Sequence, residues 1–371
     1  MVQQLDRELK NLCRRGVAEG VFPGVAAGMV LGERGNRQTI VRTAGRTGTD
    51  GDNRMTVTED TLFDLASLTK PLATALIIFA LIDEGKLSLH DPLTRFIDPG
   101  EGRLAEIDLD MLLTHSSGLA AYRPYYQRFR PVVEPGNSDA LVRAILADPL
   151  EYEPGSECRY SDLGFILLGR VIEQVSGLGL DECFSRYISG PLDLEEDIFF
   201  LRLTGSRHRL AGRSIAATEN CPWRGRVLTG EVHDEHCWLM DGVSGHAGLF
   251  GTVGAVLTMC TRILDQWQGR GESGAHALAT GLQRKYRDRT WCRGFDMPSP
   301  QGSSGGHLLS RHSIGHLGYT GTSFWIDPEK KVIMVLLSNR VHPDRSNRKI
   351  RRFRPRFHDT LLHTVLDRDG R

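Results

Sequence analysis

The sequence carries no excess of charge of either sign, since 46 Lys and Arg residues balance 46 Asp and Glu residues among 371. A balanced chain lacks the strong electrostatic field with which basic proteins attract nucleic acid or anionic membranes. We therefore expect no nucleic-acid partner. The seven cysteines are scattered and none has CxxC spacing. This usage is typical of reduced thiols in a cytoplasmic protein rather than of a disulfide framework.

The sequence also lacks the apolar segments that mark export or membrane insertion. Its first 20 residues are amphipathic and charged, without the apolar centre of a secretory signal. A membrane-spanning helix needs an uninterrupted run of about 18 apolar residues, and we find no such run in the sequence. The sequence therefore predicts no membrane span and a cytoplasmic location.

Strand-like and helix-like patterns follow one another in a definite order. Two β-rich runs, 24–32 and 37–46, flank a short turn, and residues 321–340 contain a second hairpin around "DPEKK". Helical patterns occupy 3–19, 137–149 (with Asn137 or Ser138 as cap), 162–177, 247–267 (entered from a glycine loop) and 351–367, and 108–119 combines a short helix with a loop. Strands near both chain ends with helices between them predict an α+β fold, with an antiparallel sheet flanked by helices and a helical subdomain.

These patterns predict a single catalytic unit over residues 1–371. We expect its sheet region at approximately 1–70 and 300–371, and a mostly helical region with inserted loops at approximately 71–299. The stretch 200–240 is rich in loops, and with 120–135 it is expected to shape the binding cleft.

The stretch "DLASLTKPLATAL" at 64–76 places a serine and a lysine at the start of an apolar helix. Pro71 has no N–H and is tolerated only near the first turn, so the helix begins close to Ser67. The run from Leu72 to Leu81 is almost entirely apolar, which predicts a helix buried on most sides. Ser67 and Lys70 are three residues apart and share one helical face.

Two further stretches stand at expected element boundaries: Tyr160-Ser161-Asp162 and His316-Leu317-Gly318. Taken with Ser67-x-x-Lys70, they resemble the penicillin-binding proteins and serine β-lactamases. The resemblance is to the branch that contains class C β-lactamases, DD-peptidases and esterases. Further similar segments are "LLTHSSGL" (112–119), "EPGSECRYSDLGFILLG" (153–169) and "GHLGYTGTSFWIDPE" (315–329).

The resemblance implies a β-lactamase/transpeptidase-like fold and acyl transfer to Ser67. A serine hydroxyl needs a neighbour that takes its proton; Lys70 can do so if burial lowers its pKa, and the resemblance implies that Tyr160 shares this task. It also places an oxyanion hole at the backbone N–H groups of Ser67 and Tyr319, donors worth roughly 3–4 kcal/mol each. His316 is expected to face the cleft, and Gly318 lets the strand approach the substrate.

One residue departs from the pattern, because the family usually has asparagine where this chain has Asp162. Asparagine donates a hydrogen bond to a substrate carbonyl, whereas an ionised aspartate only accepts. Asp162 can instead favour a substrate ammonium group, hold Lys70 in its charged form, or serve as the N-cap of the following helix. The departure weakens the case for penicillin hydrolysis more than the case for an acyl-enzyme.

Two charged segments have simpler interpretations than a second activity. "HDEH" at 233–236 has two histidines beside two carboxylates, but a His pair three apart without a further ligand is a weak zinc signal; we expect a loop at the mouth of the cleft. The basic segment 345–355 can touch phosphate backbones, although a solvated strip, or docking onto the chain's own acidic surface, fits the balanced charge better. No metal and no organic cofactor is expected.

The sequence thus predicts a serine hydrolase that cleaves a small ester or amide. A peptidoglycan-derived or D-amino-acid-containing compound is the leading substrate. The alternatives are a true β-lactamase, a non-catalytic binding protein with the same fold, and, on the histidine segment alone, a metallohydrolase. The intact set of Ser67, Lys70 and Tyr160 argues against the non-catalytic alternative.

Overall fold

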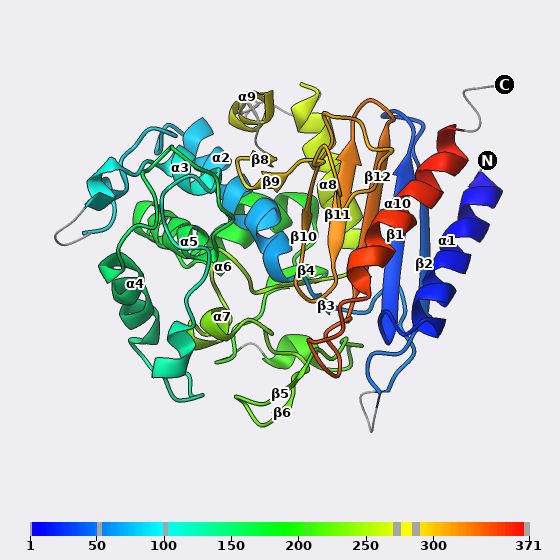
Figure 1. The fold of residues 1–371 in the computed structure, drawn as a ribbon, viewed down its shortest axis with the longest axis horizontal. Coiled ribbons are helices and arrows are strands. Elements are labelled where there is room, and N and C mark those ends of the chain that lie inside the picture. Colours follow the sequence, from blue (N-terminus) through cyan, green and yellow to red (C-terminus); the bar gives the residue numbers. More distant parts are fainter. Residues whose placement is uncertain are drawn as a thin grey trace.

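The computed structural model describes residues 2–49, 54–98, 103–205, 207–269, 276–283 and 290–366. A seven-stranded antiparallel sheet stands toward one side of the molecule (Figure 1). Its strands, in spatial order, are β2 (Gln38–Gly45), β1 (Gly24–Leu31), β12 (Val332–Ser338), β11 (Ser323–Asp327), β10 (Ile314–Leu317), β9 (Phe295–Asp296) and β8 (Trp291–Cys292). The α+β fold with an antiparallel sheet is therefore confirmed.

Both predicted hairpins are formed, and they join in the sheet. Strand β1 pairs with β2 on one side and with β12 on the other, with Gly28 opposite Val335. The two ends of the chain thus meet inside one sheet, as the sequence predicts. The sheet also includes β8 and β9, which precede the expected boundary at 300; these two-residue strands have no alternating pattern to reveal them. The assignment of one catalytic unit stays a prediction.

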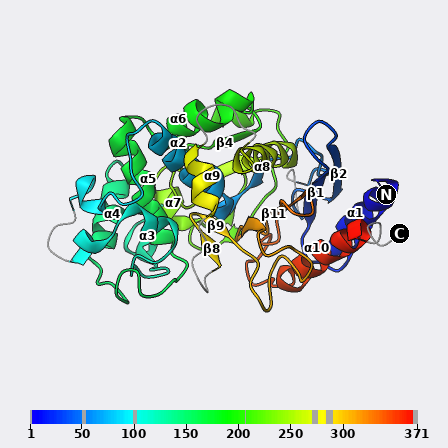
Figure 2. The same cartoon turned by 90° about the horizontal axis from the view of Figure 1, so that it is seen from above.

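Helices cover both faces of the sheet. α1 (Val2–Ala18) and α10 (Ile350–Leu366) lie side by side on one face, near the two termini (Figure 2). α8 (Val253–Trp267) packs on the other face against β1 and β12. Alternate residues of β1 explain the two layers, because Val25 and Ala27 pack with α1 and α10 whereas Ala26 joins the larger core on the α8 side.

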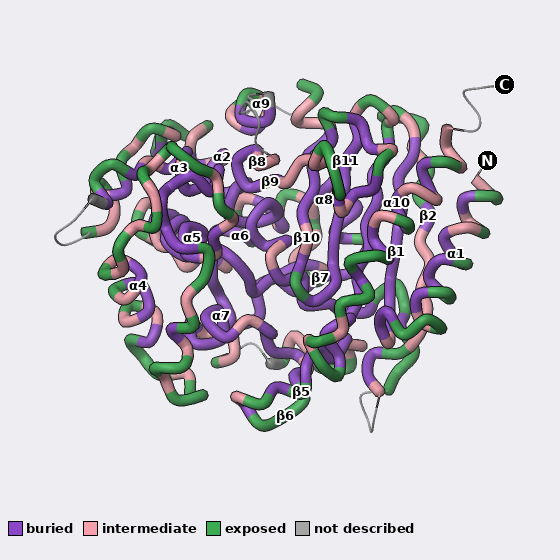
Figure 3. The backbone as a smooth tube through the Cα atoms, in the orientation of Figure 1, coloured by how far each residue is buried: buried purple, intermediate pink, exposed green. Residues whose placement is uncertain are grey.

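The remaining helices form the helical region on the other side of the molecule (Figure 1). They are α2 (Leu76–Asp83), α3 (Leu109–Leu113), α4 (Asn137–Ala147), α5 (Asp162–Ser176), α6 (Leu180–Phe184), α7 (Glu235–Leu239) and α9 (His276–Gln283). Figure 3 shows α5 and much of the surrounding backbone as buried. The predicted cap of α4 is wrong: Gly136, in the left-handed conformation, occupies the N-cap position, and Asn137 begins the helix.

Small sheets connect the helical region to the segment just before Ser67. β3 (Phe63–Asp64) pairs with β7 (Leu249–Gly251), which pairs with β4 (Ile198–Phe200). Because β7 occupies Leu249–Gly251, the helix predicted within 247–267 begins only at Val253. Thr252 is its N-cap, since the Thr252 side chain accepts a hydrogen bond from Ala255 N. A two-residue hairpin, β5 (Asn220–Cys221) and β6 (Arg226–Val227), lies within the loop-rich stretch.

The expectation about apolar length needs correction at the helical segment Ala66–Asp83. Among the described residues it is one continuous helical segment whose length and mean hydropathy of 1.5 would allow it to cross a membrane. In this fold, however, 78% of that segment is buried inside the molecule. Its apolar character is explained by the core, as the sequence predicted for residues 72–81.

Candidate active site

Ser67 lies on a short 3-10 turn, Ala66–Leu68, that leads through a π-helical segment, Lys70–Ala75, into α2. The residue before it, Ala66, has a left-handed φ of 50°, a conformation that costs a residue with a Cβ about 1 kcal/mol. The Asp64 carboxylate stabilises this turn. Its Oδ1 accepts a hydrogen bond from Ala66 N at 2.8 Å, and its Oδ2 accepts one from His233 N at 2.6 Å.

Lys70 is completely buried, and its ammonium group has specific partners. Nζ donates to Asp162 Oδ1 at 2.6 Å and to the carbonyl oxygen of His246 at 3.1 Å, and it lies 4.8 Å from the centre of the Tyr160 ring. Burial lowers the pKa of Lys70, while the Asp162 carboxylate opposes that shift. Lysine and aspartate thus form a largely desolvated ion pair beside the serine.

Tyr160 connects the serine to this ion pair. Its side chain interacts with both the Ser67 hydroxyl and the Asp162 carboxylate. Burial, followed by the negative charge of Asp162, raises the pKa of Tyr160 well above its ordinary value. The side chain is therefore a neutral phenol near pH 7. A neutral phenol both accepts and donates a hydrogen bond.

Asp162 does not cap the helix that it begins. Ser161 is the N-cap of α5, because its Oγ accepts a hydrogen bond from Gly164 N at 3.3 Å. The N-cap interpretation of Asp162 is therefore wrong. Its contact with Lys70 agrees with the alternative in which it holds the lysine charged.

His316 lies on β10 and is 1% exposed. Its Nδ1 donates to the carbonyl oxygen of Leu317 at 2.8 Å, and its ring lies 6.0 Å from that of Tyr160. Burial, with the nearby charge of Lys70, lowers the pKa of His316 to about 3, so the ring is neutral. A neutral imidazole is poorly suited to bind a substrate carboxylate.

Sequence reasoning assigned neither Trp291 nor His115 to the site. The indole of Trp291 lies 5.1 Å from the Tyr160 ring and 5.5 Å from the His316 ring. The His115 ring lies 4.8 Å from Tyr160, and its Nδ1 accepts a hydrogen bond from Ser161 N. His115 belongs to a segment quoted for the resemblance, whereas Trp291 stands in a two-residue strand that no local pattern marks.

The turn after β10 is attached directly to the residues before Ser67. Thr320 Oγ1 donates to the carbonyl oxygen of Asp64 at 2.7 Å, and Thr322 Oγ1 to that of Leu65 at 3.0 Å. A Cβ on Gly318 would lie 1.9 Å from Thr322 Oγ1 and 2.7 Å from Leu65 O. Gly318 is thus required for this close approach between the turn and the residues before Ser67; its expected role in letting the strand approach the substrate stays a prediction. Tyr319 follows it with a half-exposed side chain.

The "HDEH" segment makes contacts that differ from residue to residue. The His233 side chain pairs with Glu219 at 3.1 Å, and its ring stacks on the Tyr319 ring with the ring centres 5.6 Å apart. The Asp234 carboxylate accepts a hydrogen bond from His246 Nε2 at 2.8 Å and also caps α7. The His236 ring lies 5.4 Å from that of Tyr122. Within the described part of the chain, no group of three or more His, Cys, Asp or Glu side chains is placed to hold a metal ion.

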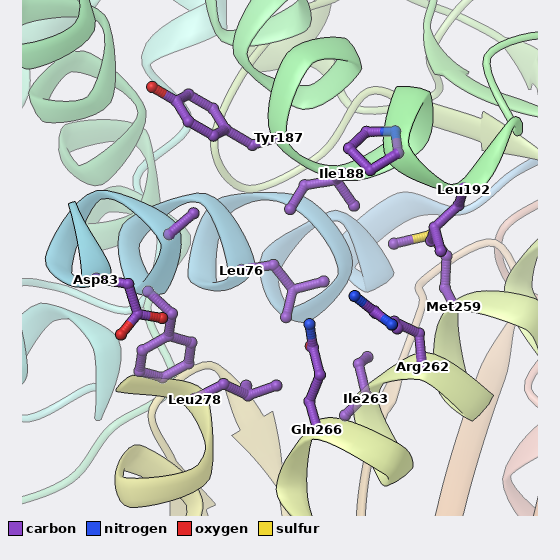
Figure 4. A pocket seen from close by; sticks show the side chains of 13 residues that line it. Leu76, Asp83, Tyr187, Ile188, Leu192, Met259, Arg262, Ile263, Gln266 and Leu278 are labelled. Atoms are coloured by element: carbon purple, nitrogen blue, oxygen red, sulfur yellow. The ribbon is translucent and has the colours of Figure 1, made fainter. Parts of the chain in front are cut away.

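A separate groove, with a volume of about 200 Å³, lies between α2, α8, α9 and the helical turns at 187–192 (Figure 4). Apolar side chains such as Leu76, Ile188 and Met259 form most of its wall. Its lining, as far as the described residues show, includes neither Ser67 nor Tyr160. The groove is therefore distinct from the cluster around Ser67.

Comparisons with known proteins support the same type of enzyme as the geometry of the site does. A sequence model of the Beta-lactamase family matches residues 9–356. Proteins of Salmonella agona (strain SL483) and Salmonella typhimurium (strain LT2), provisionally named D-alanyl-D-alanine carboxypeptidase, are each 31% identical over 323 residues. The matches cover 79% of this chain and 72% of each relative.

Solved structures show the same fold at lower sequence identity. The octameric penicillin-binding protein homologue from Pyrococcus abyssi has a TM-score of 0.70 and 22% identity, covering 93% of this chain and 75% of its own. EstCE1, described as a hydrolase with promiscuous acyltransferase activity, has a TM-score of 0.71 and 20% identity, covering 95% and 99%. The resemblance drawn from the sequence is confirmed: the chain belongs to the Beta-lactamase family and is a serine hydrolase.

Proposed function

We propose that the protein hydrolyses a small ester or amide through an acyl-enzyme on Ser67. The observation that supports this most directly is the continuous set of contacts from Ser67 through Tyr160 to the buried Lys70–Asp162 pair. These residue types in this order can remove a proton from the serine hydroxyl without a metal ion.

In the first step, Ser67 Oγ attacks the substrate carbonyl carbon. Its proton passes to the Tyr160 hydroxyl while the phenolic proton of Tyr160 moves to Asp162, whose negative charge Lys70 stabilises beforehand. This relay suits a tyrosine whose pKa is raised, because no free phenolate has to form. It also gives Asp162 a role that asparagine could not perform.

The backbone N–H groups of Ser67 and Tyr319 would stabilise the oxyanion of the tetrahedral intermediate. When the intermediate collapses, the relay runs in reverse and Tyr160 gives the proton to the leaving alcohol or amine. Water then attacks the acyl-enzyme by the same route, which releases the acid and restores Ser67. His316 and Gly318 would line the cleft along the bound substrate.

For the substrate, we propose a peptidoglycan-derived peptide or another compound that contains a D-amino acid. The names of the Salmonella relatives support this class. We also propose a cytoplasmic location, which all seven cysteines, being free thiols, support.

The decisive experiment is labelling with a fluorophosphonate followed by peptide mass spectrometry. We expect one adduct on Ser67 in the wild-type protein and none in Ser67→Ala. The same preparation should then be tested against chromogenic esters, D-aminoacyl anilides, muropeptides and a cephalosporin. Failure to label Ser67, together with no hydrolysis of any of these, would refute the proposed mechanism.

A further inference from the structure

Arg354, on α10, is a buried cation that contacts the turn carrying Tyr319. It is 7% exposed, and its Nη2 donates to the carbonyl oxygens of Gly318 at 2.9 Å and Thr322 at 2.6 Å. Burial, and then the positive charge of Arg340, lower the pKa of Arg354 to about 9, which leaves it protonated at neutral pH. No carboxylate of the described residues forms an ion pair with it.

The important feature of Arg354 is its position beside the peptide bond between Gly318 and Tyr319. The carbonyl oxygen of Gly318 and the N–H of Tyr319 belong to the same peptide group. A cation that binds the carbonyl oxygen draws electron density from that group and makes its N–H a stronger donor. The effect is larger in a buried, water-poor environment than in water.

Arg340 fixes the next carbonyl along the turn. Its Nε donates to Tyr319 O at 2.9 Å, and its guanidinium carbon lies 4.6 Å from the centre of the Tyr319 ring. Its Nη1 is held by the carbonyl oxygens of Arg345 and Asn347. Two guanidinium groups from the C-terminal part of the chain therefore hold successive carbonyls, while Gly318 N donates to Thr322 O from inside the turn.

We propose that Arg354 is a positioning residue that strengthens the Tyr319 N–H as a donor to the reaction's oxyanion. The inference rests on the proposed function, in which that N–H forms half of the oxyanion hole. Arg354 touches no substrate atom and acts only through the Gly318–Tyr319 peptide. Its benefit is greatest when a full negative charge develops, so it lowers the barrier more than it tightens substrate binding.

The test compares Arg354→Met and Arg354→Lys with Arg356→Met. Arg356 lies on the same helix, but it is more exposed and pairs with Glu19. The substrate is p-nitrophenyl acetate, and the second probe is a boronic acid that forms a tetrahedral anionic adduct with Ser67. We expect Arg354→Met to lower kcat by about 10- to 100-fold with KM within about twofold, and to weaken boronate binding by a similar factor. Arg354→Lys should recover part of both losses, and Arg356→Met should match the wild type.

Several results would overturn the inference. These are an unchanged kcat in folded Arg354→Met, a rise in KM with kcat unchanged, or a kcat loss without weaker boronate binding. If Arg354→Met does not fold, Arg354→Lys decides by the same criteria; if neither folds, the residue is structural and the inference fails. A wild-type protein that does not label at Ser67 refutes the proposed function instead, which separates the two failures.

Discussion

At the scale of single residues, position 162 carries an aspartate where the family usually has asparagine, and this difference changes the chemistry of the proposed site. An asparagine beside Lys70 would leave a buried ammonium group without a counter-ion. The carboxylate at 2.6 Å supplies that counter-ion and also raises the pKa of Tyr160. The consequence is a site in which the tyrosine stays a neutral phenol and the proton of the serine has a carboxylate to move toward.

Asp162→Asn should therefore lower both activity and stability. We expect kcat for p-nitrophenyl acetate to fall by about 100-fold or more, because the relay loses its proton acceptor. The free energy of unfolding in urea should fall by about 3 kcal/mol, since Lys70 is left buried and unpaired. As a control, Asp139→Asn removes a carboxylate that is half exposed and pairs with Arg170 at the surface. Wild-type kcat in Asp162→Asn would show that Lys70 alone takes the proton.

At the scale of elements, close backbone contact between α5 and the 242–248 loop holds Lys70 in place. A Cβ on Gly245 would lie 2.0 Å from Phe165 O and 2.9 Å from Gly169 N. The carbonyl oxygen of Gly245 accepts from Thr74 Oγ1 at 2.7 Å, and that of the next residue, His246, accepts from Lys70. Gly245 and Gly169 thus allow the 242–248 loop to approach α5 closely enough for the His246 carbonyl to reach Lys70.

Gly245→Ala tests this arrangement. The added methyl group must displace the loop from α5, so we expect a loss of about 1–3 kcal/mol in the free energy of unfolding. Activity should fall as well, because the His246 carbonyl moves away from Lys70. Gly254→Ala is the matched control: Gly254 is exposed in α8, its added Cβ would be 4.0 Å from the nearest atom, and alanine there should stabilise the helix slightly. Equal stability in the two variants would contradict the proposed role of the contact.

At the scale of the whole molecule, the segment after β12 ties the C-terminal part of the chain to the loop-rich stretch. Arg345 binds Glu219 and Glu235, and Glu219 also accepts a hydrogen bond from His233. The sequence offers two structural interpretations of the basic segment, and one of them is docking onto the chain's own acidic groups. The ion pairs of Arg345 agree with that interpretation. His233 in turn stacks on Tyr319, so this ion network reaches the site.

The network predicts a defined pH dependence of stability. Burial alone would raise the pKa of Glu219, but hydrogen bonds from His233 and Arg345 outweigh it and lower the pKa from 4.5 to about 2. A lowered carboxyl pKa stabilises the folded state above pH 4.5, and this contribution is lost as the pH falls toward 2. We expect Glu219→Gln to be less stable than the wild type by roughly 1–3 kcal/mol at pH 7, with the difference shrinking below pH 4.5. Urea unfolding across this range measures it, with exposed Glu157→Gln as control. A difference that does not change with pH would exclude this linkage.

The order of amino acids alone predicts the order of the main strands and helices, and it points to Ser67, Lys70 and Tyr160 as residues of the proposed site. It could do so because periodicity, proline position and motif spacing are local properties, readable from Ser67 to Lys70 or along Val332–Ser338. Three contacts become apparent only in the folded chain: Asp162 binds Lys70, Trp291 lies beside Tyr160, and Arg354 reaches the Gly318 carbonyl. These contacts join residues 36 to 131 positions apart in the chain, and such partners are chosen by packing and burial of the whole molecule rather than by any pattern along it.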